Sequence, residues 1–320
     1  MITPSLESRV SGITAACREC GLSLTPVGPL SWSVALPAND ARVHARLEAG
    51  WLLLDGPVPA RAEQHSPWAL LQANALLAGP GKFALGPGRR PRLRAEIPAD
   101  DTSFLSARVR AVADDFAHGA QLLAGPGPTV APASAGRPAP APSTGGDAPA
   151  PAAETLGALC ESAGWTFIER SRERLMIALE VPDAFVQASV ERVASGTVCV
   201  STELARFDAL TPLSRRALAY LLLHASGLVH MARAAARVHE GEGASVGFEV
   251  RLELPLTPAE LNHALLSLTA AARLCGREIS ALRGERLART YLDVHESGSR
   301  AIRLTEPTPL TAKEDCHAPQ

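Results

Sequence analysis

The segment Gly125–Ala153, GPGPTVAPASAGRPAPAPSTGGDAPAPAA, divides this sequence of 320 residues into two parts. Of its 29 residues, 22 are Pro, Gly or Ala, and Val130 is the one large aliphatic residue. Such a composition cannot bury enough apolar surface to offset the entropy lost on ordering, and its prolines favour extended conformations. It predicts a linker, with a PxxP-type docking segment as the alternative, between domains at residues 1–124 and 154–296; a polar tail, residues 297–320, follows.

The two flanking parts carry the same sequence signals in the same order. A helical pattern closes on glycine in each part, and an apolar strand then ends at Pro37 in the first and at Pro182 in the second. A Ser/Thr-Pro helix start follows, at Pro67 and at Pro212. Both proline pairs are 145 positions apart, so two independent markers align the two parts with the same offset. We interpret the chain as a tandem duplication of one domain.

The later strands refine this interpretation. They end at Pro98 and Pro255, which are 157 positions apart, so the second copy has about a dozen extra residues, expected in the stretch Arg233–Ala244. Period-two alternation predicts half-exposed antiparallel strands such as Arg92–Pro98. Thr257 to Glu260 form a capping box that starts a closing helix. Each copy is expected to be an α+β unit: a helix, about three strands, a helix, one or two strands and a helix.

Composition limits the classes of partner. Hydrophobic residues make up 46% of the chain and charged residues 20%, which excludes a disordered chain or a coiled-coil rod. A net charge of -2 gives no general attraction to nucleic acid or to an anionic membrane. The longest apolar stretches, such as Leu218–Leu223, are far shorter than the about 20 residues that span a bilayer, so no membrane insertion is expected. Six thinly spread cysteines and no signal-peptide pattern predict a cytoplasmic protein with reduced thiols.

Sequences that imitate catalytic motifs fail on their context. Gly243–Gly247 fits G-x-S-x-G, but a strand follows it where a nucleophile elbow needs a helix, so we interpret it as a loop entering a hairpin. Gly79–Lys82 lacks the flanking residues of a phosphate-binding loop. We expect no catalytic residue, metal site or cofactor. The rival hypothesis is an enzyme whose site uses the Cys17/Cys20 thiols or the histidines His224 and His230.

Apolar strand residues are more abundant than three small helices can cover in each copy. The sequence therefore predicts that the other copy or a bound client segment covers part of this surface. The client-contact candidates are Trp32, Leu36, Trp51, Leu53, Ile177, Leu179, Val198 and Val200.

The order of elements resembles the type III secretion chaperone fold, which includes the CesT-like chaperones and the related YbjN proteins. The matching elements are Trp68–Asn74, Arg92–Pro98 and the closing helix of the first copy, with Ala219–His224, Glu249–Pro255 and Leu261–Cys275 of the second. Such chaperones are non-enzymatic and hold an extended segment of a client protein on apolar sheet surfaces. This chain departs from them in being nearly neutral and in carrying two copies.

The resemblance implies a peptide-binding chaperone or adaptor, with a YbjN-like regulatory scaffold as an alternative. The family dimerises through its central helix, so the two copies are expected to dock as an intramolecular pseudo-dimer, giving a monomer rather than a homodimer. The candidate residues of this inter-domain interface are Trp68, Leu71, Tyr220, Leu222 and Leu223.

Overall fold

The computed structural model describes most of the two predicted domains. The described residues are 5–36, 42–56, 58, 65–86, 90–100, 104–124, 155–181, 184–194, 196–207, 210–239 and 243–301. The predicted linker, the markers Pro37 and Pro182, and the predicted tail beyond Ala301 lie outside them.

The first half begins with helix α1 (Leu6–Glu19), capped by the Ser5 side chain, and ends with helix α3 (Leu105–Ala124). Between them, helix α2 (Pro67–Leu76) is capped by Ser66 and has proline at its first turn, as the sequence predicts. The strands are β1 (Ser23–Gly28), β2 (Ser31–Ala35), β3 (Arg42–Glu48), β4 (Trp51–Gly56), β5 (Lys82–Leu85) and β6 (Pro91–Pro98).

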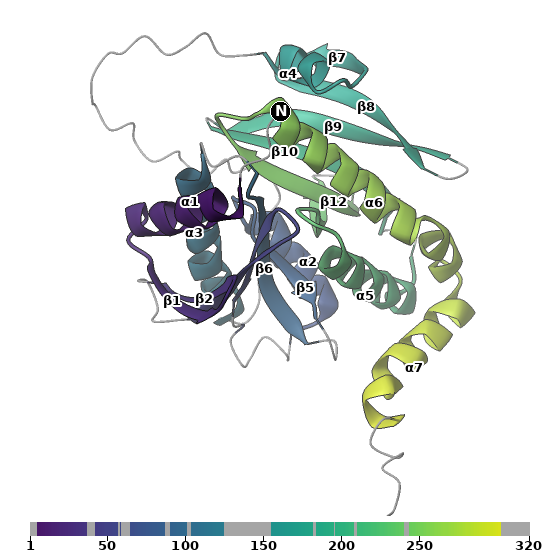
Figure 1. Cartoon of the computed structure of the whole chain (residues 1–320). Coiled ribbons are helices and arrows are strands. Elements are labelled where there is room, and N and C mark those ends of the chain that lie inside the picture. The colour runs from purple at the N-terminus through teal and green to yellow at the C-terminus, as the bar shows by residue number, and fades with distance from the viewer. Residues whose placement is uncertain are drawn as a thin grey trace, which may run out of the picture.

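The second half repeats this order (Figure 1). Its helices are α4 (Leu156–Ser162), α5 (Pro212–Leu228), α6 (Pro258–Leu282) and an additional α7 (Glu285–Ala301). Its strands are β7 (Phe167–Ser171), β8 (Arg174–Val181), β9 (Ala184–Ala194), β10 (Thr197–Arg206), β11 (Arg233–His239) and β12 (Gly243–Glu253). The predicted capping box at Thr257 and Glu260 starts α6.

The two sheets have the same topology. Their strand orders are β1-β2-β3-β4-β6-β5 and β7-β8-β9-β10-β12-β11, and all described pairings are antiparallel. Each half thus has four strands before its central helix rather than the expected three. The missed strands are the edge strands β1 and β7, whose residues are mostly exposed and therefore lack an apolar alternation.

Three details of the second half differ from the expectation. The extra residues lie partly in the central helix, which has 17 residues in α5 against 10 in α2, and not only in the stretch Arg233–Ala244. The expected domain end at residue 296 falls inside α7. Gly243–Gly247 belongs to β12 rather than to a loop; Ser245 lies within a strand, so no nucleophile elbow forms there.

Each sheet has one apolar face covered by helices of its own half. In the first half, α1 and α3 lie on this face; in the second, α6 crosses β8, β10 and β12 (Figure 1). The paired strands give exact equivalences, since Trp32, Val34 and Leu36 occupy the register of Leu175, Ile177 and Leu179. These six side chains are all buried.

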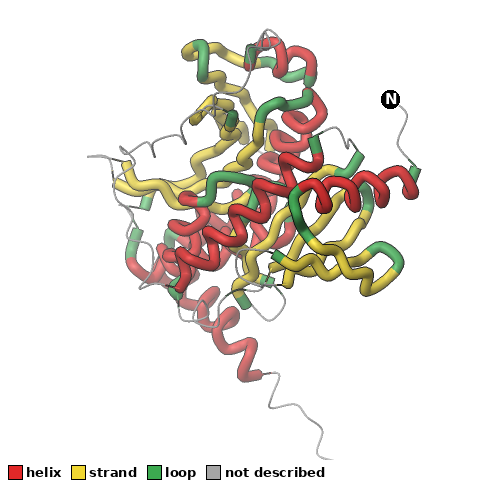
Figure 2. The backbone as a smooth tube through the Cα atoms, turned by 90° about the vertical axis from the view of Figure 1, so that its left-hand side faces the viewer, coloured by secondary structure: helices red, strands yellow, loops and turns green. Residues whose placement is uncertain are grey.

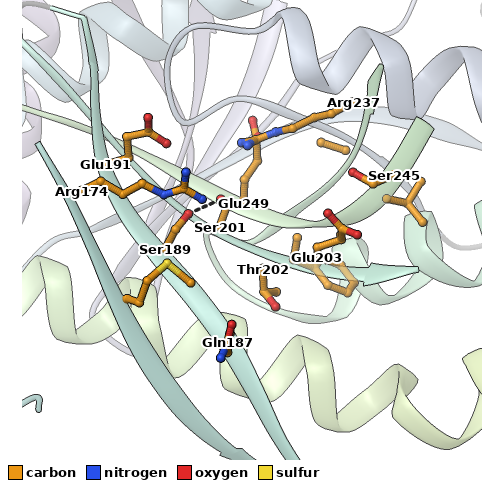
Figure 3. Close-up of a pocket in the computed structure, with 15 residues that line it drawn as sticks. Arg174, Gln187, Ser189, Glu191, Ser201, Thr202, Glu203, Arg237, Ser245 and Glu249 are labelled. Atoms are coloured by element: carbon orange, nitrogen blue, oxygen red, sulfur yellow. Dashed lines mark hydrogen bonds and ion pairs between the residues drawn. The ribbon is translucent and has the colours of Figure 1, made fainter. Parts of the chain in front are cut away.

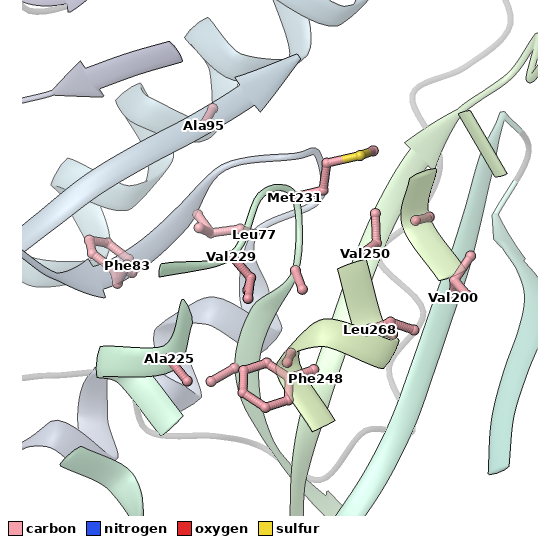
Figure 4. Packing of buried hydrophobic residues seen from close by; sticks show 14 of the residues in the cluster. Leu77, Phe83, Ala95, Val200, Ala225, Val229, Met231, Phe248, Val250 and Leu268 are labelled. Atoms are coloured by element: carbon pink, nitrogen blue, oxygen red, sulfur yellow. The ribbon is translucent and has the colours of Figure 1, made fainter. Parts of the chain in front are cut away.

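The two halves contact each other through their central helices. Figure 2 shows helices lying between the two groups of strands. Helix α2 packs on β11 of the second half, and the corresponding helix α5 packs on β5 of the first half. The two contacts are therefore related by a pseudo-twofold symmetry. The helices α2 and α5 also contact each other, as do the strands β5 and β11. Figure 4 shows apolar residues of both halves in this region, Leu77 and Phe83 from the first and Val229 and Met231 from the second.

A buried cation of each half donates hydrogen bonds to backbone carbonyl oxygens of the other half. The Lys82 Nζ donates to the carbonyl oxygens of Val229, at 2.7 Å, and Ala232, at 3.3 Å, in the second half. Arg233 begins β11 as Lys82 begins β5, and it donates to carbonyl oxygens of the first half. The accepting residues are Leu77, Gly79 and Gly81.

Each of these cations has a buried carboxylate partner. Lys82 pairs with Glu96 at 2.9 Å, and Arg233 pairs with Glu249 at 2.7 Å. Glu96 also accepts the backbone N–H of Met231, from the other half, at 3.1 Å. Polar groups buried in this way must be paired, so the contact between the halves has a specific geometry.

Candidate functional site

The predicted client-contact residues lie in the interior of the chain. All except Trp51 are buried, so they form no open binding surface here. Leu53 is directed to the opposite sheet face from Leu52 and Leu54, and in register it faces Glu96. The ring of Trp51 is half-buried and stacks on His230 of the second half, with centroids 4.6 Å apart. The surplus apolar surface is thus covered by the protein itself.

The predicted interface residues lie on the two central helices that meet. Leu71, Leu222 and Leu223 are buried. The ring of Trp68 lies 4.4 Å from that of Phe207 in the second half. Trp68 and Tyr220 both line a cavity of about 560 Å³ between the halves.

The second sheet has a groove on the face opposite α6 (Figure 3). Its volume is about 420 Å³, and side chains from β8, β9, β10, β11 and β12 line it. The lining is largely polar; Figure 3 labels Arg174, Gln187, Ser189, Glu191, Ser201, Thr202, Glu203, Arg237, Ser245 and Glu249. The hydroxyls of Ser189 and Ser201 lie 3.1 Å apart across β9 and β10.

One polar atom near the groove has no partner among the described residues. The Thr202 Oγ1 atom is buried and makes no hydrogen bond within the described structure. Thr202 is paired with Ala188 and Phe248, whose side chains lie in the apolar core, so its hydroxyl lies on the α6 side of the sheet and not in the groove. Arg174 lines the groove and is exposed.

Gly247 explains how the groove floor is shaped. A Cβ atom at this position would lie 1.7 Å from the carbonyl oxygen of Thr202, so only glycine allows β12 to approach β10 here. The register of this strand pair shifts between Glu203 and Ala205, next to the same contact. The close approach brings the Thr202 backbone, and not its side chain, beside Gly247 at the groove.

The floor of the groove holds a buried charge cluster. Glu249 is buried and pairs with Arg233 at 2.7 Å, with Arg251 at 3.2 Å and with Arg237. Burial by itself raises the pKa of Glu249, but the charges of Arg233, Arg251 and Arg237 outweigh it and hold this pKa well below its usual 4.5. Arg237 also donates to the Cys199 Sγ at 3.2 Å.

The equivalent face of the first half carries different chemistry. Strand register places Asp55 where Ser201 lies, His44 where Ser189 lies and Arg94 where Glu249 lies. Register also places Glu96 where Arg251 lies, so the acidic and basic positions of this face are exchanged between the halves, whereas both sheets keep an apolar opposite face. Periodicity cannot reveal this difference, because both faces have the same alternation of polar and apolar residues.

Of the two thiols in the rival hypothesis, Cys17 is buried, and the half-buried Cys20 Sγ donates to the carbonyl oxygen of Ser106 at 3.1 Å. Burial is the main cause that raises the pKa of Cys17 to about 12, Cys160 to about 11 and Cys275 to about 12, so these thiols stay protonated. His224 is exposed on α5, whereas His230 lies beyond the end of that helix and stacks on Trp51. Burial lowers the pKa of His230, which favours its neutral ring.

We expect these three thiols to resist alkylation in the folded chain. Iodoacetamide at pH 8 should label Cys17, Cys160 and Cys275 slowly, because little thiolate is present, and quickly after unfolding in urea. Peptide mass spectrometry of both samples measures each site. Rapid labelling of any of the three in the folded chain would contradict this assignment and favour a thiol enzyme.

Comparison with known proteins adds no assignment: no family model, curated protein or solved structure matches this chain. The described residues contain no group of three or more His, Cys, Asp or Glu placed to hold a metal ion. Nor does any helix in the described ranges have the length and apolar character needed to cross a membrane. The groove of about 420 Å³ on the second sheet is the candidate site.

Proposed function

We propose that this chain is a non-enzymatic chaperone or adaptor that holds an extended segment of a client protein. The observation that supports this proposal is the groove of about 420 Å³ on the second sheet, with Ser189, Ser201 and Ser245 in its lining. Serine hydroxyls both donate and accept hydrogen bonds, so they match the N–H and C=O groups of an extended backbone. The client surface is thus polar, and not the apolar strand residues that the sequence alone suggests.

The first half serves in this proposal as the support of the second. The reciprocal contacts of α2 with β11 and α5 with β5 favour an intramolecular pseudo-dimer, formed within one chain rather than between two. The different residues at His44 and Asp55 favour a division of labour in which only the second half binds, as in a regulatory scaffold. We place the protein in the cytoplasm, where its free cysteines stay reduced.

Filling the groove tests the proposed function. Gln187 is exposed and lines the groove, so Gln187→Trp should occupy the volume and weaken binding of a fluorescein-labelled random decapeptide pool by about tenfold. The matched control is Arg42→Trp, since Arg42 occupies the same register in the first sheet and is also exposed. Fluorescence polarisation with the full chain measures both.

The expected result is lost binding in Gln187→Trp alone. Equal binding by the wild type and both variants would exclude the groove as the peptide site. No binding of the pool by the wild type would remove the support for a peptide-binding function altogether.

A further inference from the structure

The cavity of about 560 Å³ between the halves is formed by both of them. Its lining from the first half is the segment 65–68 at the start of α2. Its lining from the second half comes from α5, together with Phe207 and Ala244. The cavity therefore exists only where the halves are docked. It shares no described lining residue with the groove on the second sheet.

Three aromatic side chains line this cavity. Phe207 is buried, whereas Trp68 and Tyr220 are half-buried and keep part of their surface accessible. The rings of Trp68 and Phe207 are tilted by 41° with their centroids 4.4 Å apart, so the two rings hold each other in place. Aromatic walls favour a flat aromatic ligand, which can stack on one ring and meet the edge of another.

The charged side chains among the described lining residues are basic. They are Arg215 and Arg216, and no Asp or Glu is among the described lining residues. Arg215 is exposed, and its Nε donates to the carbonyl oxygens of Phe207 and Leu210, each at 3.0 Å. These two acceptors are neutral, so they position the guanidinium without cancelling its charge.

We propose that this cavity binds a small planar aromatic carboxylate. Its ring lies against Trp68 and Tyr220, and its carboxylate accepts hydrogen bonds from the terminal nitrogens of the Arg215 guanidinium. A volume of about 560 Å³ is within the range of small-molecule sites. Because both halves line the cavity, the bound ligand also stabilises their docked arrangement. This inference is independent of the proposed peptide-binding groove.

Three compounds test the two parts of the recognition. Naphthalene-2-carboxylate has the ring and the charge, naphthalene-2-carboxamide lacks the charge, and cyclohexanecarboxylate lacks the aromatic ring. Isothermal titration calorimetry with the full chain should give a dissociation constant of about 100 μM for naphthalene-2-carboxylate. Each of the other two compounds should bind about tenfold more weakly, because each loses one of the two contacts.

The variant Arg215→Gln connects the charge preference to its residue. It should weaken the binding of naphthalene-2-carboxylate about tenfold, to the level of the carboxamide. The matched control is Arg273→Gln on α6, since Arg273 is also an exposed helical arginine that donates to a backbone carbonyl oxygen, that of Glu180. Arg273 does not line the cavity, so this variant should bind as the wild type does.

The variant Tyr220→Leu tests the aromatic wall. It keeps an apolar side chain and removes the ring, so it should weaken the binding of naphthalene-2-carboxylate about three- to tenfold.

The outcomes separate this inference from the proposed function, because none of them involves the groove on the second sheet. Absence of binding of naphthalene-2-carboxylate at millimolar concentration overturns the inference. Equal affinities for the carboxylate and the carboxamide, or a preference for the carboxylate that survives in folded Arg215→Gln, overturn it as well. If Arg215→Gln does not fold, Tyr220→Leu decides, and an unchanged affinity counts against the inference.

Discussion

Replacing Glu249 by glutamine is expected to destabilise the folded chain by about 3–5 kcal/mol, the usual cost of removing one partner from a buried ion pair. Glu249 is 1% exposed, and its carboxylate balances Arg233, which is equally buried, together with Arg237 and Arg251. Because Arg233 also holds the loop carbonyls of the first half, the loss should loosen the contact between the halves.

The matched control is Glu203→Gln on the adjacent strand β10. Glu203 pairs with Arg206, but both side chains are largely exposed, so its loss should cost less than about 1 kcal/mol. Urea unfolding followed by circular dichroism measures both variants. Equal stabilities of the two variants would show that the Glu249 cluster does not stabilise the contact between the two halves.

The same carboxylate predicts a pH dependence. The pKa of Glu249 lies below its usual 4.5 in the folded chain, so between these two values the unfolded chain binds a proton that the folded chain does not. Its stabilisation is therefore complete above about pH 5 and decreases as the pH falls. The difference in unfolding free energy between wild type and Glu249→Gln should narrow from pH 7 to pH 3. Asp115 is present in both proteins, and burial raises its pKa, so its opposite effect is common to the two curves.

Gly227→Ala should weaken the contact between the halves by about 1–3 kcal/mol, the cost of overpacking a close-packed interface. Gly227 lies near the end of α5, and a Cβ atom there would come within 2.6 Å of the Leu85 carbonyl oxygen on β5 of the first half. That oxygen belongs to the backbone, so the strand or the helix must move.

Gly276→Ala provides the matched control. Gly276 also lies in a helix, α6, but a Cβ atom there meets nothing within 4 Å. This substitution should stabilise the chain by about 0.5–1 kcal/mol through helix propensity alone. The contrast between the two glycines isolates the effect of the close approach.

Cleaving the linker measures the contact between the halves directly. In a chain with a protease site placed within residues 125–153, the wild-type halves should co-elute on gel filtration after cleavage, and the Gly227→Ala halves should separate more readily. Separation of the wild-type halves at micromolar concentration would refute the proposed pseudo-dimer. Tethering raises the effective concentration of the halves, so only the cleaved chain reveals the strength of their contact.

The sequence predicted the elements that have a strong local signal. The Ser/Thr-Pro helix starts, the capping box at Thr257 and the alternating strand Arg92–Pro98 are all present, because caps and period-two patterns act over a few residues. Strand β7 was missed, since an exposed edge strand needs no apolar alternation. Leu53 was selected for its apolar neighbours, but it is buried, on the sheet face opposite Leu52 and Leu54.

The sequence alone predicted two parts of one α+β class, each with an apolar sheet face, because these follow from local periodicity and from proline and glycine positions. Only the tertiary structure decided the site. Ser201, Arg237 and Glu249 are separated along the chain and come together through the register of β10, β11 and β12. Their pairing also depends on Arg233, whose charge is enclosed by the first half. Charge balance is a property of three-dimensional neighbours, and it is invisible to a pattern read along one strand.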